Sequence, residues 1–175
     1  MSQIAPWFQR KFEFSFPLEL YPNLLARLRG TPARLEETVG GASNERLVYR
    51  SGEKWSAQEH AGHLLDLEPL WLARVDDYLA GGEELTAADL SNRRTHEANH
   101  NARQIVEILA EFRAARKLLV DRVEASEPAV FSCAKQHPRL KQPMRLVDHL
   151  YFVAEHDDHH LAQIWELCGF SRRSA

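Results

Sequence analysis

The 175-residue sequence predicts an all-α fold, and within that class a four-helix bundle, on two observations. Four long segments repeat apolar residues at helical spacing, and no run of alternating residues is long enough to build a sheet. Amphipathic helices must bury their apolar faces, and four of them do so most simply in a bundle. The length and the 44% hydrophobic content suit one core, so we expect a single domain over residues 1–175.

The first sixteen residues are predicted to be an extended N-terminal arm, followed by the helical bundle over residues 17–169. In "KFEFSFP", Phe12, Phe14 and Phe16 alternate with polar residues. This period of two is too short for a sheet but is typical of an extended segment that is fixed to a surface by every second side chain. We expect the arm to pack its aromatic rings on the helices.

The first two helices differ in how clearly they begin and end. The first starts after Pro17, and the Gly30 and Pro32 of "RGTPARLEE" predict a kink or break within it. The second has a clear start in "KWSAQEH", where Ser56 and Glu59 match the S-x-x-E capping box. A glycine pair beginning at Gly81 is its expected end.

The third and fourth helices are predicted from their apolar periodicity. The third is expected from about Ala98 to Val123. The fourth is expected to begin near Pro143 or Met144 and to continue to Cys168, with Gly169 as its stop. The connections on both sides of the third helix are long, so one of them can make consecutive helices parallel.

Composition excludes several classes of protein. The net charge of −3 and a pI of about 6.3 give no overall electrostatic attraction for nucleic acid or for an anionic membrane. No apolar run is long enough to span a bilayer, and the N-terminus does not read as a secretion signal. Cys133 and Cys168 match neither a zinc ribbon nor a redox motif, so reduced thiols are expected. Together these features predict a cytoplasmic protein.

The segment "AEHDDHHLAQI" places three histidines in an otherwise apolar helix. His156 and His160 are four residues apart, so both imidazoles project from one face and can close on one metal ion, while His159 projects to one side. His149 lies on the same face further back. Two imidazoles rarely hold an ion firmly, so a third ligand is expected from another helix.

The second helix offers two candidates for that third ligand. In "EHAGHLLD", His60 and His63 both lie near the apolar face, and their spacing does not decide between them. With His156 and His160, either would complete a three-histidine site that leaves room for water or substrate. The alternative is that all these histidines are hydrogen-bonded in the interior or solvated, without a metal.

A second metal motif is present in "HEANH", which matches H-E-x-x-H from His96 to His100, with Glu97 as the general base of a metalloprotease. The motif lies in the polar run "SNRRTHEANHNARQ", and no third ligand follows at a characteristic spacing. We therefore do not assign a metalloprotease site to it.

The segments "KWSAQEHAGHLLDLEPLW" and "MRLVDHLYFVAEHDDHHLAQI", preceded by "LLARLRGTPARLEE", resemble the DinB-like family, also called the DinB/YfiT-like metalloenzymes. The resemblance covers nearly the whole chain. It implies a four-helix bundle with up-down-down-up connectivity, a dimer, and a metal held by three histidines, which carry over to His63, His156 and His160. The metal it implies is nickel or zinc, with water in the remaining positions.

The function that the resemblance implies is metal-dependent activation of a thiol or of water. Similar folds include thiol-dependent S-transferases and a mycothiol-dependent maleylpyruvate isomerase. We therefore expect a metalloenzyme of S-transferase or hydrolase type, acting on a small-molecule substrate with a low-molecular-weight thiol as a candidate partner. The alternative is a non-catalytic module that is stabilised by a metal or binds a small ligand.

Carboxylates near the histidines in sequence can orient the ligating rings, because such imidazoles usually give their other N–H to a carboxylate or carbonyl. Asp66, Glu155 and Asp157 are the candidates, with solvation at the surface as the alternative. Trp55 is expected to pack at the start of the second helix. Three further aromatic residues are expected in the core: Trp71, Tyr151 and Phe152.

Overall fold

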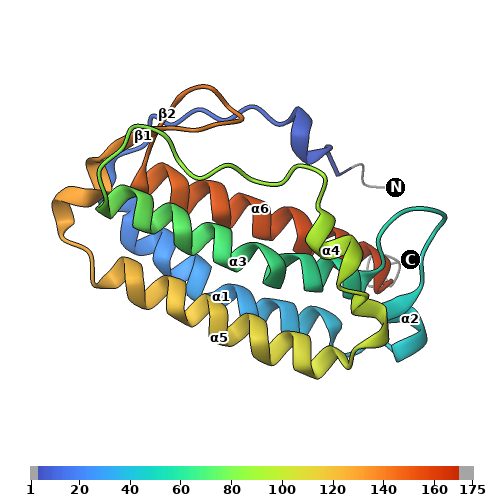
Figure 1. The fold of residues 1–175 in the computed structure, drawn as a ribbon. Helices are drawn as coiled ribbons and strands as arrows, with labels where there is room; N and C mark the ends of the chain where they lie inside the picture. The colour runs from blue at the N-terminus through green and yellow to red at the C-terminus, as the bar shows by residue number, and fades with distance from the viewer. Residues whose placement is uncertain (1–3, 170–175) are drawn as a thin grey trace.

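The computed structural model describes residues 4–169 and is a four-helix bundle (Figure 1). The four long helices are α1 (Tyr21–Val39), α3 (Ala57–Leu79), α5 (Ile105–Glu124) and α6 (Leu146–Leu167). Two short helices, α2 (Asn44–Val48) and α4 (Arg93–Glu97), lie in the connections. The all-α, four-helix class predicted from the sequence is confirmed.

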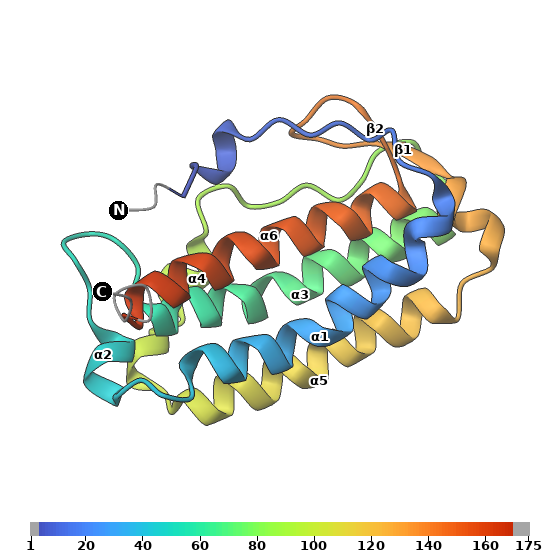
Figure 2. The same ribbon diagram turned by 180° about the vertical axis from the view of Figure 1, so that it is seen from behind.

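The directions of the helices follow from contacts near their ends. Tyr78, at the end of α3, donates a hydrogen bond to the carbonyl oxygen of Met144, just before α6, at 2.8 Å, so these two helices are antiparallel. Asp76 and Arg122 pair near the C-terminal ends of α3 and α5, so those two are parallel. Figures 1 and 2 show α1 and α6 running one way and α3 and α5 the other, which is an up-down-down-up order.

Helix α1 is continuous through Gly30 and Pro32, so of the kink or break expected there, the break does not occur. A proline inside a helix lacks the N–H that would donate to the carbonyl four residues earlier. Here that carbonyl belongs to Leu28, and the buried Arg116 of α5 donates to it at 3.2 Å. The partner lost within α1 is replaced by a side chain of the facing helix.

Helix α3 begins as its sequence predicts. The Ser56 side chain accepts from the backbone N–H of Glu59, and the Glu59 carboxylate accepts from the backbone N–H of Ser56, which completes the capping box. Arg50 pairs with the same carboxylate and holds the pKa of Glu59 at about 2, against the opposing effect of burial. The start of this helix fixes the direction in which His60 and His63 project.

The third long helix begins later than expected, at Ile105 and not at Ala98. Asn99 adopts a left-handed conformation, with φ of 49°, and ends the helical path that α4 begins. A single 3₁₀ turn, His100–Ala102, follows before α5. The polar segment that reads as helical in sequence is therefore a folded connection that covers α3.

The start of the last helix is also shifted, because Pro143–Arg145 form strand β2. This strand pairs antiparallel with β1 (Ala134–Gln136), with Lys135 opposite Met144. The two strands form a hairpin above one end of the bundle (Figure 1). No sheet was expected, but this hairpin is too small to change the fold class.

The segment before α1 lies along α6 (Figures 1 and 2). The ring of Phe12 is buried against Trp7 and Phe152, and Phe14 and Phe16 are half-buried. Of the predicted arm, residues 1–3 lie outside the described residues. None of the helices within residues 4–169 is long and apolar enough to cross a membrane.

Candidate metal centre

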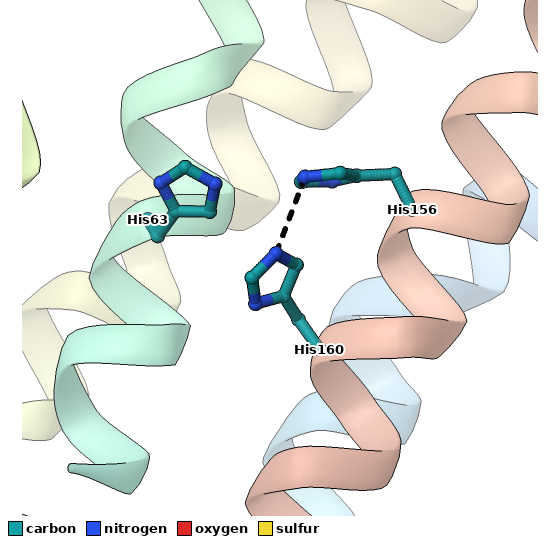
Figure 3. Close-up of side chains that lie close together, drawn as sticks. All are labelled: His63, His156 and His160. Atoms are coloured by element: carbon teal, nitrogen blue, oxygen red, sulfur yellow. Dashed lines mark hydrogen bonds between the residues drawn. The ribbon is translucent and has the colours of Figure 1, made fainter. Parts of the chain in front are cut away.

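Three histidines from two helices converge inside the bundle (Figure 3). His63 projects from α3 toward α6, and His156 and His160 project back from α6. All three are buried, with 4%, 4% and 6% of their surfaces exposed. One ring nitrogen of each lies within 4.8 Å of the other two. The structure therefore brings together the residues that the family resemblance implies.

The spacing of the ring nitrogens fits a shared metal ion. The Nε2 atoms of His156 and His160 are 3.2 Å apart. Zinc–imidazole bonds are about 2.0–2.1 Å long, so two ring nitrogens on one ion lie roughly 2.9–3.4 Å apart at octahedral to tetrahedral angles. The observed separation falls inside that range, and the donor set of three imidazoles suits zinc and nickel equally.

A buried relay fixes the orientation of His63. The hydroxyl of Thr95 donates to the carboxylate of Asp66 at 2.9 Å, so its oxygen is left to accept from Nδ1 of His63, 3.0 Å away. A proton on Nδ1 leaves the lone pair of a neutral imidazole on Nε2. The relay thus selects the tautomer that can ligate a metal and holds the ring in place.

His100 supports the same relay from the connection before α5. Its Nε2 lies 2.8 Å from the Asp66 carboxylate. Its ring packs so closely on α3 that a Cβ at Gly62 would lie 2.2 Å from the His100 ring. Only glycine leaves this space, so Gly62 of "AGH" in the second helix has a packing role beside the candidate ligand His63.

His60 approaches the cluster from the other side. Its Nδ1 lies 2.8 Å from Nδ1 of His160, so it contacts the outer nitrogen of that ring. The sequence left His60 and His63 as alternatives, and the structure gives them different places. His63 joins His156 and His160 in the group that can hold an ion, while His60 contacts the back of His160.

All four imidazoles are held neutral at physiological pH. Burial is the main cause, and it lowers the pKa of His63 to about 3 and that of His60 to about 4. The pKa values of His156 and His160 are lowered well below the usual range by burial and by the neighbouring histidines. Neutral rings keep their lone pairs, which is the state that binds a metal.

Aromatic side chains surround the histidine cluster. Trp55 lies against His63 with 4.8 Å between ring centroids, so it contacts the candidate site as well as packing near the start of α3. Trp71 and Trp7 pack edge-on against His156, at 5.5 and 5.0 Å. The indoles keep the surroundings of the rings apolar.

A cavity of about 450 Å³ opens beside the cluster, and His63, His156 and His160 form part of its wall. The half-buried His159, predicted to be a bystander on α6, also lines it. The other lining residues come from the arm, α3, α6 and three connections, namely Trp7, Phe8, Trp55, His60, Leu67, Leu70, Trp71, Arg74, Ala87, Ala88, Asp89, Leu90, Asn92, His137, Pro138, Arg139 and Phe152. Ligand sites are commonly such concave, mostly apolar spaces with a few polar groups.

The three candidate carboxylates behave differently. Asp66 is connected to His63 through Thr95. Glu155 pairs with Arg10 and Arg27 at the edge of α6. Asp157, which is fully buried, pairs with an arginine of α5 and belongs to a separate network. Of these three carboxylates, only Asp66 is therefore connected to the histidine cluster in the described part of the chain.

The H-E-x-x-H motif does not form a metal site. His96 is exposed on α4, whereas His100 is buried in the following 3₁₀ turn. The left-handed Asn99 separates them, so the two rings do not share a helix face. His100 instead contributes to the relay behind His63.

Thr95 and His100 are functional candidates that the sequence did not reveal. Both lie in a polar segment without apolar periodicity, 29 and 34 residues from their partner Asp66. The only sequence signal for His100 was its place in the H-E-x-x-H motif, which is typical of a metalloprotease site and not of a residue that supports another histidine. No feature of the sequence distinguishes Thr95 from its neighbours.

Comparisons with known proteins agree with this arrangement. The model of the DinB superfamily matches residues 27–164, which include every histidine of the cluster. Among solved structures, the chain is similar to YfiT from Bacillus subtilis, with a TM-score of 0.79 and 20% identity over 94% of this chain and 95% of that one. That structure is described as "a probable metal-dependent hydrolase with an unusual four-helix bundle topology". No curated protein matches the chain. Because the family match spans most of the sequence, this chain belongs to the DinB superfamily.

Proposed function

We propose that His63, His156 and His160 bind one divalent metal ion, nickel or zinc, through their Nε2 atoms. The observation that carries this proposal is the convergence of three neutral, buried ring nitrogens on one point at the wall of a cavity. The 3.2 Å separation of the His156 and His160 nitrogens supports it, as does the relay that leaves Nε2 of His63 free. Nδ1 of His156 has no hydrogen-bond partner in residues 4–169, so this ring is held mainly by packing.

The site has the composition of a catalytic metal centre. Catalytic zinc sites use three protein ligands and keep a position for water or substrate, whereas structural sites are closed by four. The cluster in the described residues has three histidines and no fourth His, Cys, Asp or Glu within ligand distance, and it faces the cavity. A non-catalytic module stabilised by metal would be expected to close the site, for which the geometry offers no support.

The proposed activity is metal-dependent activation of water or of a thiol for attack on a small molecule. A divalent ion in such a site acts as a Lewis acid and acidifies a bound water or thiol. Thr95 and Asp66 keep the His63 ring aimed and neutral, and Trp55 and Trp71 restrict access of bulk water. The description of YfiT favours hydrolysis, and the family resemblance keeps thiol transfer as the second candidate.

Metal titration of the chelator-treated protein by isothermal calorimetry tests the ligand set. We expect one zinc or nickel ion per wild-type chain and a loss of at least a hundredfold in affinity for His63→Ala and for His160→Ala. The matched control is His159→Ala, on the same helix and lining the same cavity, which should bind metal as the wild type does. Unchanged affinity in both ligand variants would contradict the assignment.

A further inference from the structure

The cavity has a cationic end away from the histidine cluster. It is formed by Arg74 of α3 and by His137 and Arg139 of the loop between β1 and β2, which we call the cationic subsite. Two arginines next to one another in a cavity usually face carboxylates of the protein. Each of these three side chains instead has donor capacity that the described chain leaves unused.

Arg74 is almost fully buried, with 2% of its surface exposed, and is not part of an ion pair within residues 4–169. Its Nε donates to the carbonyl oxygen of Thr86 at 2.9 Å, and its guanidinium packs over the ring of Trp71. The nearby Asp77 carboxylate accepts from the backbone N–H of Thr86, 2.6 Å away. The guanidinium of Arg74 therefore carries a charge that no carboxylate within residues 4–169 pairs with directly.

Arg139 is half-buried at the same end of the cavity. Its guanidinium lies over the rings of Phe8 and Phe152, at 5.4 and 5.8 Å from their centroids. Its Nη2 is buried and has no hydrogen-bond partner in the described chain. An unpaired buried donor on a charged group is costly, because the group has lost its water without gaining an acceptor.

The tautomer of His137 makes its Nε2–H a third hydrogen-bond donor at this end of the cavity. Its Nδ1 accepts from the backbone N–H groups of Arg139 and Leu140, at 3.2 and 3.1 Å. A neutral ring that accepts at Nδ1 carries its proton on Nε2. That Nε2–H lies 3.2 Å from Nη1 of Arg74, which is also a donor, so two donors face one another and neither satisfies the other.

The electrostatics of the three groups agree with this geometry. Burial lowers the pKa of Arg74 to about 10 and also lowers that of Arg139. Burial and the two arginines lower the pKa of His137 to about 3, so its ring is neutral. The protein thus keeps one buried and one half-buried cation side by side in the cavity, where an added anion would be stabilised.

We propose that the cationic subsite binds the anionic group, a carboxylate or a phosphate, of an elongated ligand whose apolar body lies along the cavity toward the histidine cluster. The apolar walls between the two ends include Leu67, Leu70, Trp71 and Phe152. Arg74 and His63 are eleven residues apart on α3, about 16 Å along a helix axis, and the long arginine side chain spans part of that distance. That this ligand is also the substrate rests on the proposed function. The binding of its anionic group to the cationic subsite does not depend on the proposed function.

Calorimetric binding of three six-carbon probes to the full chain tests the proposal: hexanoate, hexyl phosphate and the neutral hexanamide. Each probe is titrated into chelator-treated and zinc-loaded protein. We expect at least one of the two anions to bind at least tenfold more tightly than hexanamide, with or without zinc, and the tighter anion identifies the group. Since the subsite contains no metal ligand, failure of the metal proposal would leave this result intact.

The variant Arg139→Gln should abolish the preference for the anion, while binding of hexanamide is retained as evidence of an intact cavity. The matched control is Lys141→Gln, a cation of the same loop that does not line the cavity and pairs with Glu84. Anions that bind no better than hexanamide would overturn the proposal. So would an anion preference that depends on zinc and survives Arg139→Gln, because the anion would then be bound at the histidine cluster.

Discussion

Two buried polar clusters lie between the helices of this bundle, and they differ in whether the chain satisfies them. The ion-pair network consists of Arg116 from α5, Glu68 from α3, and Asp157 from α6. The histidine cluster lies between α3 and α6 and consists of His63, His156 and His160. Both take polar groups out of water, so each needs compensation.

In the ion-pair network the protein supplies every partner. Arg116 donates to both carboxylates and to the carbonyl oxygen of Leu28, with distances from 2.5 to 3.2 Å. Thr31 of α1 adds a hydrogen bond to Asp157 at 2.9 Å, so all four helices contribute. The network therefore connects the bundle without needing any added ligand.

In the histidine cluster the chain supplies partners only for the outer nitrogens of two rings. Thr95 accepts from His63, and His60 contacts His160, while one ring nitrogen of each histidine faces the other two and Nδ1 of His156 has no partner within residues 4–169. Burial of polar groups alone therefore does not indicate a ligand site. Lone pairs that converge without donors from the chain are what favour a metal ion here.

Acid should destabilise the protein through the histidine cluster, by more than any of the changes below. Histidines with a folded pKa below 6.5 stabilise the fold above that pH, and this contribution is lost as the pH falls from 6.5 toward the folded pKa. The loss is about 1.4 kcal/mol per pH unit for each such histidine.

Urea unfolding of the chelator-treated protein between pH 7.5 and 4.5 measures this effect. A double variant, His63→Gln with His160→Gln, should have a visibly flatter pH dependence, because two of the titrating groups are absent. An equally steep dependence in the double variant would show that the acid sensitivity arises elsewhere in the chain.

Removal of the central arginine of the ion-pair network should cost about 3–5 kcal/mol of unfolding free energy, because two buried carboxylates lose their counter-charge. The variant is Arg116→Met, measured by urea unfolding at pH 7.5. Its matched control is Arg113→Met on the same helix, which breaks a surface pair with Glu36 and should cost about 0–1 kcal/mol. Equal losses in the two variants would remove the distinction between a buried network and a surface pair.

Loss of the relay hydroxyl should weaken metal binding while the fold is retained. In Thr95→Val, His63 loses the acceptor of its Nδ1 proton, but Asp66 keeps its contact with His100. We expect a 10–100-fold lower affinity for zinc, the usual cost of removing a group that orients a ligand. Thr38→Val is the control, because the Thr38 hydroxyl donates to the carbonyl oxygen of Arg34 within α1. Unchanged zinc affinity in Thr95→Val would count against the relay.

Local signals in the sequence predicted much of the fold. The capping box of Ser56 and Glu59 and the apolar periodicity placed α3 correctly. Of the kink or break predicted at Pro32, the break does not occur because Arg116 compensates the free carbonyl of Leu28, a contact between residues 88 positions apart. Such a contact leaves no pattern in either segment.

The histidine cluster was also predictable only where its residues follow a local pattern. The i, i+4 spacing of His156 and His160 predicts two of the proposed ligands directly, whereas periodicity could not choose between His60 and His63, and only the family resemblance did. Thr95 supports the cluster from a connection whose path depends on the left-handed Asn99. Residues brought in by an irregular backbone have no periodicity from which to be predicted.

A crystal structure of the zinc-loaded protein, with anomalous data at the zinc edge, tests the central claim most directly. We expect one anomalous peak, about 2.0–2.1 Å from Nε2 of His63, His156 and His160, with non-protein ligands in the remaining positions. No peak is expected at the ion-pair network of Arg116. A peak away from the three histidines, or a site closed by a fourth protein ligand such as His60, would contradict an open, catalytic metal centre.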